Sequence, residues 1–324
     1  MRSQADLAHA FHELHSRAAP FVIPNPWDVG SARVLAGMGF EALATTSSGF
    51  AYSIGKRDNM FTREESMAHL RALVANVDVP INADLGNAFG DDPATVAETF
   101  REVAALGVVG ASVEDASGDG EHPIYEFELA VDRVRAAAEA TSTLPFPFML
   151  TARAENFLHG RRDLADTIRR LQAFQEAGAD VLYAPGISTK EEIAAVMWAV
   201  DRPVNVLIGM PGMAFSVSDL AELGVKRIST GGGLARAAIG ALMRAGAEMR
   251  DEGTFTFLKD AGSFRDVNPW MAGSRWHAST KSTKGTKVVG VGTGSDACIV
   301  HLSPVRLTAG DGCATLFRAL GDAR

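Results

Sequence analysis

Short apolar runs that fit β-strands alternate with longer amphipathic runs that fit α-helices along most of this 324-residue chain. Helical patterns such as 92–107 and 163–180 separate the strands, and Gly107, Gly178 and Gly224 stand where helix C-caps are expected. Alternating strands and helices form parallel sheets, and eight units in about 210 residues predict a closed (β/α)8 barrel, the TIM-type α/β fold. The eight strand runs are 21–25, 41–46, 79–84, 110–115, 147–153, 180–185, 203–208 and 225–230.

The alternative to the barrel is an open, doubly wound sheet. Such sheets usually have fewer strands and a glycine-rich turn after the first one. Here the first strand continues into NPWDVGS, which contains no such turn, so the pattern favours the barrel.

The alternating pattern stops after Asp260. Residues 261–324 mix Gly, Ser, Thr and Lys with scattered short apolar runs, and they contain both cysteines of the chain, Cys298 and Cys313. This segment carries 8 Lys and Arg residues against 4 Asp and Glu residues, whereas the whole chain has a net charge of −8. We therefore predict a catalytic barrel domain at 1–260 and an irregular, weakly ordered C-terminal extension at 261–324.

Composition excludes several classes of function. Residues 1–297 contain no cysteine, which excludes thiol nucleophiles, zinc–cysteine sites and iron–sulfur ligation from the main body. The acidic balance argues against a nucleic-acid partner. No segment approaches the length of a membrane span, and the start of the chain lacks the apolar core of a signal peptide, so we expect a cytoplasmic protein without a membrane partner.

We expect His9, His12 and His15 to lie on a solvated helix face.

Polar residues occur where the predicted strands end. In a (β/α)8 barrel this is the catalytic end, and Asp84, Glu114 and Arg153 close three neighbouring strands there. Two carboxylates and a guanidinium suit a hard cation such as Mg²⁺ together with an anionic ligand. A structural ion pair at the barrel rim is the alternative. Asn205, at the end of the seventh strand, is a further candidate for substrate binding.

Seven stretches between residues 20 and 255 occur in an order typical of one known superfamily: PNPWDVGSARVLAGMGFEALATTSSGFA, INADLGNAFGDDP, VGASVEDASG, LTARAENFL, LQAFQEAGADVLYAPG, RPVNVLIGMPG and ELGVKRISTGGGL. Over these residues the chain resembles the isocitrate lyase/phosphoenolpyruvate mutase superfamily, in the phosphonomutase-like branch that includes carboxyvinyl-carboxyphosphonate phosphorylmutase. The resemblance implies a (β/α)8 barrel, a homodimer or homotetramer that commonly swaps its last helix, and a Mg²⁺ cofactor. It also implies a small carboxylate or phospho-substrate whose C–C or P–C bond is cleaved or formed through an enolate-like species.

The resemblance implies roles for individual residues. Asp84 matches the principal metal carboxylate, Glu114 the acid that reaches the ion, often through water, and Arg153 the arginine that binds the anionic group of the substrate. Asp58 matches an acid on a mobile gate, and a solvated loop charge is the alternative for it. The loop whose backbone amides hold the substrate oxygen is matched by Ser48, Gly49 and Phe50.

The chain departs from the superfamily pattern at two places. Gly86 stands where members usually place a second acid, two residues after the metal aspartate, which removes one carboxylate contact to the ion. Isocitrate and methylisocitrate lyases carry a Lys-Lys-Cys-Gly-His loop after the fourth strand, whereas this chain has Ala116-Ser-Gly-Asp-Gly-Glu-His122. Without that thiol, both activities are excluded. Glu121 and His122 could shuttle protons instead, or simply be solvated.

Three functions follow from these observations. The leading one is a Mg²⁺-dependent lyase that cleaves a C–C bond of a small 2-oxo or 2-hydroxy dicarboxylic acid through an enolate. The second is a mutase or hydrolase of phosphoenolpyruvate or phosphonopyruvate, in which Asp58 orients the nucleophile or the phosphoryl group. The third, suggested by Gly86, is a catalytically silent barrel kept as a binding module.

Overall fold

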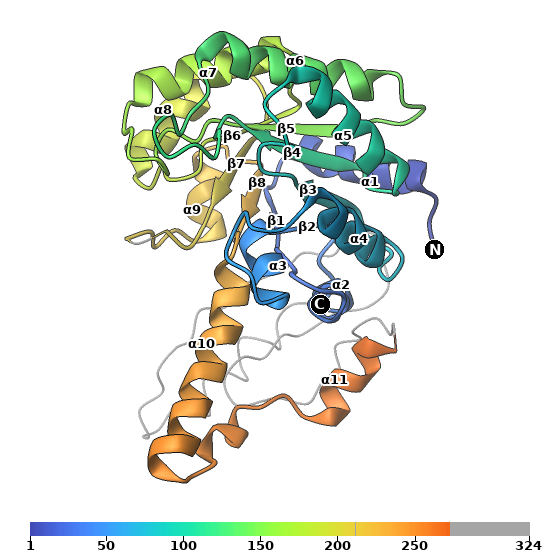
Figure 1. Cartoon of the computed structure of the whole chain (residues 1–324), viewed down its shortest axis with the longest axis vertical. Coiled ribbons are helices and arrows are strands. Elements are labelled where there is room, and N and C mark those ends of the chain that lie inside the picture. The colour runs from blue at the N-terminus through green and yellow to red at the C-terminus, as the bar shows by residue number, and fades with distance from the viewer. Residues whose placement is uncertain (211, 273–324) are drawn as a thin grey trace, which may run out of the picture. The chain divides into compact units, whose positions relative to one another are not determined.

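The computed structural model describes residues 1–210 and 212–272, whose eight strands form one parallel sheet in the order β1-β8-β7-β6-β5-β4-β3-β2 (Figure 1). β1 pairs with β8, and the Ala44 amide donates to the Pro24 carbonyl at 3.1 Å, which connects β2 to the end of β1. The sheet is therefore a nearly closed barrel, and the predicted (β/α)8 fold is confirmed. Its strands are β1 (Phe21–Ile23), β2 (Leu43–Ala44), β3 (Ile81–Asp84), β4 (Gly110–Glu114), β5 (Met149–Arg153), β6 (Val181–Tyr183), β7 (Val204–Leu207) and β8 (Arg227–Ser229).

Helices follow the strands around the outside of the barrel (Figure 1). In the described part of the chain, three further helices stand outside this alternation: α1 before the first strand, α3 directly after β2, and α11 after the barrel. The helices are α1 (Gln4–Ser16), α2 (Val29–Gly37), α3 (Ser47–Ser53), α4 (Arg63–Val74), α5 (Pro93–Ala105), α6 (Phe127–Ser142), α7 (Leu164–Glu176), α8 (Lys190–Ala199), α9 (Val217–Glu222), α10 (Gly233–Ala247) and α11 (Phe264–Met271). A π-helical turn (Glu248–Glu252) and a 3-10 turn (Thr256–Lys259) follow α10.

Helix α5 shows how the sequence places these elements. Its N-cap Asp92 accepts the Ala94 amide at 3.3 Å, and Pro93 occupies the first turn, where its missing N–H is not needed. Gly107 follows the helix with a φ of +100°, a left-handed conformation that glycine adopts without a steric penalty. Gly178 and Gly224 have φ values of +107° and +85° in the corresponding positions after α7 and α9, as predicted.

Helix α1 closes the N-terminal end of the barrel. Its Phe11 and Leu14 are buried among apolar side chains from the starts of the strands, including Phe21, Met149 and Val181. We call this apolar layer the barrel floor. His15 also lies in it, with its ring centroid 4.8 Å from that of Phe11 and 4.9 Å from that of Phe21. The prediction of a solvated face is therefore wrong for His15, because α1 is covered by the barrel on this side.

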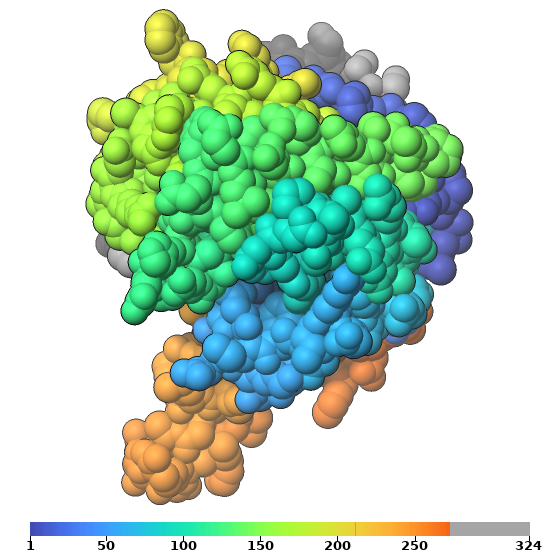
Figure 2. All heavy atoms as spheres, turned by 45° about the horizontal axis from the view of Figure 1, so that its top comes forward, coloured from blue at the N-terminus to red at the C-terminus, as the bar shows by residue number. Residues whose placement is uncertain are grey.

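Helix α10 and the turns after it project away from the barrel in both views (Figures 1 and 2). The chain then forms α11, which packs against α2: the Trp270 ring lies so close to Gly37 that a Cβ there would be 2.6 Å from it. The predicted boundary at 260/261 stays a prediction, and residues 273–324 of the extension lie outside the described residues. Among the residues that are described, no helix is both long enough and apolar enough to cross a membrane. The cytoplasmic location stays a prediction.

Candidate active site

A small cavity of about 160 Å³ opens at the C-terminal ends of the strands. We call it the mouth cavity. Its lining is mostly polar, although the interior of such barrels is usually filled with branched aliphatic side chains. Its polar lining residues are Asn25, Thr45, Thr46, Ser47, Ser48, Asp58, Asn82, Asp84, Ser112, Arg153, Tyr183, Asn205, Arg227 and Ser229.

Arg153 joins the predicted carboxylates at the mouth of the barrel. Its Nη1 lies 2.8 Å from Asp84 Oδ1, its Nη2 lies 3.1 Å from Glu114 Oε2, and its Nε donates to Glu155 Oε1 at 2.8 Å. Strand pairing explains part of this arrangement, because Glu114 and Arg153 are partners in the β4–β5 register and Asp84 is paired with Ser112 on β4. The structure thus brings the three predicted residues together, and it adds Glu155, which the sequence did not single out.

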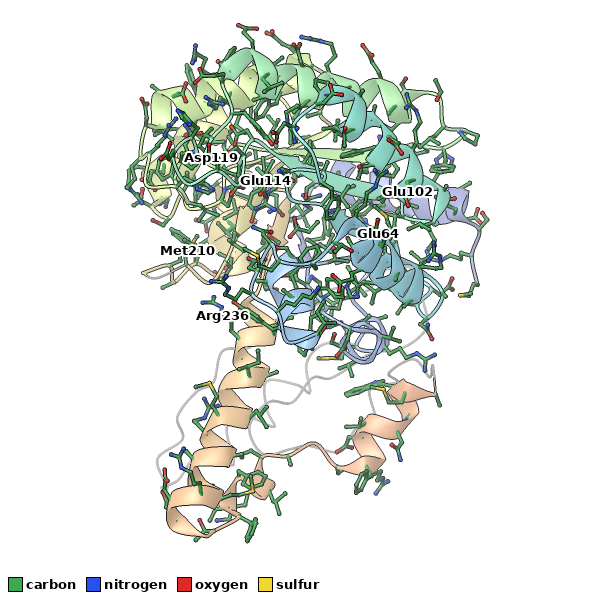
Figure 3. All side chains as sticks on the ribbon, in the orientation of Figure 1. Glu64, Glu102, Glu114, Asp119, Met210 and Arg236 are labelled. Atoms are coloured by element: carbon green, nitrogen blue, oxygen red, sulfur yellow. The ribbon has the colours of Figure 1, made fainter. Side chains whose placement is uncertain are left out.

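This cluster holds more negative than positive charge. Burial raises the pKa of Glu114 to about 8, and the charge of Arg153 opposes that rise. The nearby carboxylates add to the rise: Glu155, Asp84 and Asp58. Burial likewise raises the pKa of Glu155. Burial disfavours the charge of Arg153, but the surrounding carboxylates, Glu155 first, raise its pKa well above the usual value. A second cation at this position would relieve the repulsion among the carboxylates. Figure 3 shows Glu114 among the side chains at the strand ends, with Asp119 farther along the loop that follows β4.

The donor set fits Mg²⁺. Asp84 and Glu114 supply carboxylate oxygens, and Mg²⁺ is commonly held by one or two carboxylates together with waters and substrate oxygens. Asp84 is oriented by the Ser47 amide, which donates to Oδ2 at 3.1 Å, and by the Ser112 hydroxyl, which donates to Oδ1 at 3.4 Å. In the part of the chain that is described, no group of three or more His, Cys, Asp or Glu side chains is arranged to hold a metal. The ion would therefore keep several waters.

Gly86 explains why the carboxylate set is small. It lies beside Glu114 with a φ of +56°, and a Cβ built on it would be 3.8 Å from Glu114 Oε1 and 3.9 Å from Asn59 Oδ1. These are ordinary contact distances. A Cβ therefore meets no close neighbour at this position, although its left-handed backbone favours glycine.

The sequence profile of the phosphoenolpyruvate phosphomutase family matches residues 11–250. The chain belongs to the isocitrate lyase/phosphoenolpyruvate mutase superfamily. Members of this superfamily are enzymes, and they include carbon–carbon lyases and phosphomutases.

Individual superfamily members are similar over most of the barrel. The solved structure of a candidate lyase/mutase from Burkholderia cenocepacia J2315 is 56% identical, with a TM-score of 0.82, and the match covers 84% of this chain and 99% of that one. An uncharacterized protein of Mycobacterium tuberculosis is 32% identical over 68% of this chain and 81% of its own length. The 2-methylisocitrate lyase of Halalkalibacterium halodurans is 25% identical over 81% of this chain and 85% of its own.

Residues 48–50, predicted to form a loop whose backbone amides hold the substrate oxygen, lie in the short helix α3. The Thr46 hydroxyl caps it by accepting the Gly49 amide at 3.4 Å, and the Phe50 amide donates to the Thr46 carbonyl at 3.0 Å. The Phe50 side chain is buried, with its ring stacked 4.2 Å from that of His69. Ser48 lines the mouth cavity. Of the three predicted residues, Ser48 is therefore the one placed to meet a substrate directly.

Asp58 reaches the mouth cavity from the loop between α3 and α4. Burial raises its pKa, with Asp84 adding to the rise, while a hydrogen bond with the Ser47 side chain and the charge of Arg153 oppose it. The Lys56 ammonium, 2.6 Å from Glu65 Oε1, connects the same loop to α4. The structure therefore brings Asp58 to the site, as a gate residue requires.

The remaining candidates differ in their surroundings. Asn205 is buried on β7 and donates from Nδ2 to Ser229 Oγ at 2.9 Å. Its Oδ1 accepts Arg227 Nε, also at 2.9 Å. Arg227 was missed by the sequence reasoning, although an arginine in the middle of a predicted buried strand was a visible signal. His122 is exposed and lies 3.3 Å from Asp119, as expected of a solvated loop residue.

Proposed function

We propose that this protein is a Mg²⁺-dependent lyase that cleaves a C–C bond of a small 2-oxo or 2-hydroxy dicarboxylic acid through an enolate intermediate. The observation that carries the proposal is that Arg153 lies within ion-pair distance of both Asp84 and Glu114 at the catalytic end of the barrel, where Asp84 and Arg153 line a small polar cavity. A cavity of about 160 Å³ has room for about five water molecules at about 30 Å³ each, which suits a small acid.

The chain's own residues would bind and orient the substrate. Asp84 and Glu114 would hold Mg²⁺, which supplies Lewis-acid stabilisation of negative charge on the substrate when it is bound. Arg153 would hold an anionic group of the substrate at the mouth, with its guanidinium kept in place by Glu155 at 2.8 Å. Ser48 would donate a hydrogen bond to the oxygen on which charge develops.

The loop that carries Asp58 would act as a gate. It enters the mouth cavity from the side of α3 and contains Gly55, whose φ of +72° allows a sharp turn. Closure of such a loop excludes water from the enolate and so limits its unproductive protonation.

The lyase chemistry would not be that of isocitrate or methylisocitrate lyases. Their loop after the fourth strand carries a cysteine, whereas residues 116–122 here carry none, and the first cysteine of the chain is Cys298. His122 does not replace the thiol, because it is exposed beside Asp119. The proton donor must therefore be another group at the strand ends or a water.

Phosphoenolpyruvate or phosphonopyruvate chemistry is the second candidate. It is favoured by the position of Asp58, which lines the same cavity as Arg153 and could orient a nucleophile or a phosphoryl group. The third possibility, a silent binding module, rests on the missing acid at Gly86.

We further propose a homodimer or homotetramer. Helix α10 and the turns that follow it expose large apolar side chains, including Leu242 and Met243, each 69% exposed, and Phe255 and Leu258, each 61% exposed. Exposed apolar side chains gathered on one projecting segment are typical of a protein–protein contact.

A panel assay tests the proposed function. Purified full-length protein is incubated with oxaloacetate, alkylmalates, phosphoenolpyruvate and phosphonopyruvate, with Mg²⁺ or with EDTA, and products are followed by NMR. Mg²⁺-dependent cleavage of a dicarboxylate supports the lyase. Turnover of only the phospho-compounds selects the second candidate. Lack of turnover of every compound would leave the binding module as the better description.

A further inference from the structure

Arg227 is a buried cation that has no role in the reaction proposed above. It lies on β8, is 3% exposed, and lines the mouth cavity from within the barrel. Its hydrogen bonds go to neutral acceptors: Nε donates to Asn205 Oδ1 at 2.9 Å and Nη2 donates to Thr151 Oγ1 at 3.0 Å. Its Nη1 is buried and has no hydrogen-bond partner in the described part of the chain.

The charge of Arg227 is also uncompensated. No carboxylate lies within ion-pair distance of it among the described residues. Tyr183 and the like-charged Arg153 influence its pKa, and Arg227 in turn lowers the pKa of His15 in the barrel floor. Burial lowers the pKa of its guanidinium, and the charge of Arg153 lowers it further, whereas Tyr183 raises it. A buried, unpaired charge with a free donor is unfavourable and rare in folded proteins. It becomes favourable when an anion completes the pair.

Arg153 presents the opposite situation. Each of its three guanidinium nitrogens lies within ion-pair distance of a carboxylate, namely Asp84, Glu114 and Glu155. The two arginines thus differ in what they offer a ligand: the mouth has carboxylates in excess, and the interior has a cation in excess. Thr151, which accepts from Arg227, precedes Arg153 on β5 by two residues, a step of about 6.6 Å along a strand.

We infer that Arg227 binds the distal carboxylate of the substrate, so that the preferred ligand is a dicarboxylate that spans from the metal-binding mouth to the barrel interior. The inference rests on the proposed function, which it deepens by naming the residue that selects a second carboxylate. The reacting end of the acid stays with Asp84, Glu114 and Arg153, and the distal carboxylate accepts the free Nη1 hydrogen bond. Asn205 and Thr151 hold the guanidinium and act as positioning residues.

A matched pair of ligands tests this inference. Malate and 2-hydroxybutyrate share the 2-hydroxy acid end and differ at the far end, where malate has a carboxylate and 2-hydroxybutyrate a methyl group. Calorimetry with the full-length protein and Mg²⁺ should show that malate binds about 10–100-fold more tightly, the effect of one charged hydrogen bond. Arg227→Met should abolish this preference and leave the affinity for 2-hydroxybutyrate within about twofold.

Two further variants keep the test decisive. Arg227→Gln is neutral but retains a donor for Asn205 or Thr151, so it replaces the Met variant if that protein melts early or loses its circular dichroism. Arg227→Lys keeps the charge and should retain part of the preference for malate. If a folded neutral variant still prefers malate as strongly as the wild type, the inference is wrong.

Asp84→Ala separates this inference from the proposed function. It should weaken binding of both ligands alike, because it removes the end of the site that they share. If Asp84→Ala leaves both affinities unchanged, the proposed metal site is wrong and the inference fails with it. If Asp84→Ala weakens both but the wild type does not distinguish malate from 2-hydroxybutyrate, the proposed function stands and the role of Arg227 is overturned.

Discussion

The two ends of the barrel are built from the same eight strands but hold opposite kinds of side chain. At the floor, Phe11 and Leu14 of α1 pack with Phe21, Met149 and Val181 into an apolar layer. At the mouth, a few residues farther along the same strands, carboxylates surround Arg153, and the cavity below is lined with hydroxyl, amide and guanidinium groups. The strand that supplies Met149 to the floor supplies Arg153 to the mouth.

This contrast separates stability from function. The floor buries apolar area, which stabilises the fold without demanding a particular chemistry. The mouth gathers like charges, and in the interior below it the buried Arg227 Nη1 has no hydrogen-bond partner among the described residues. Both arrangements oppose folding unless a ligand completes them. Substitutions at the floor should therefore change stability and leave specific activity in place, whereas substitutions at the mouth should do the reverse.

The largest effect is expected at Asp84. Asp84→Ala removes a proposed metal carboxylate, and with Gly86 beside it no second acid on this loop compensates. We expect turnover with Mg²⁺ to fall about a thousandfold or more, as when a key electrostatic group is removed from an active site. The melting temperature should stay close to that of the wild type. Near-normal turnover at low Mg²⁺ would show that Asp84 is not a metal ligand.

Phe11→Ala tests the floor. This side chain is fully buried, and its ring fills the space beside Gly110, where a Cβ would be 2.8 Å from Phe11 Cε1. Removing it should reduce the free energy of unfolding by about 3–5 kcal/mol. Urea unfolding measures the loss, and Phe11→Leu is the matched control with a smaller one. The comparison fails if the folded Phe11→Ala protein loses specific activity as severely as the Asp84 variant.

Arg153→Lys should have a smaller effect at the mouth than Asp84→Ala. A lysine ammonium carries the charge but cannot reproduce three fixed N–H directions toward Asp84, Glu114 and Glu155. The apparent KM for the substrate should rise about 10–100-fold, with a smaller change in kcat. Steady-state kinetics on the substrate found in the panel assay measure both constants. An unchanged KM would mean that Arg153 has only a structural role.

The smallest effect concerns pH and the floor. Burial lowers the pKa of His15 to about 3, well below the usual 6.5, so the unfolded chain takes up a proton that the folded chain does not. The stability contributed by neutral His15 is complete above pH 6.5 and is lost as the pH falls from there toward 3. Between pH 7 and pH 5 this amounts to about 2 kcal/mol.

His15→Leu removes this titration. Its unfolding free energy, measured with urea at both pH values, should therefore decrease less than that of the wild type. Parallel decreases in the two proteins would show that His15 does not control the acid sensitivity of the floor.

The barrel could be predicted from the sequence because its signals are local. Alternating strand and helix patterns and the glycines after the helices, such as Gly107, depend on residues close together in the chain, and the strand ends then follow. The meeting of Asp84, Glu114 and Arg153 was predictable for the same reason, since the topology places neighbouring strand ends side by side.

The parts that escaped prediction depend on contacts between distant residues. The pairing of Arg227 with Thr151 crosses the barrel between β8 and β5, and no periodicity in either strand encodes it. The burial of His15 depends on where α1 docks. The amides of Gly49 and Phe50 were expected to face the substrate. Both instead donate hydrogen bonds to Thr46, which caps the short helix α3.

Gly86 has a consequence on an evolutionary timescale. A glycine codon can become an aspartate codon by a single base change, and aspartate tolerates a φ of +56° better than most residues do. The Cβ of the new residue would make only ordinary contacts with Glu114 and Asn59. The number of acids beside the proposed metal site can therefore change in one mutational step, while the floor that holds the barrel together is left untouched. If the site holds Mg²⁺ as proposed, its affinity for the ion would be a trait that selection can adjust without first having to rebuild the fold.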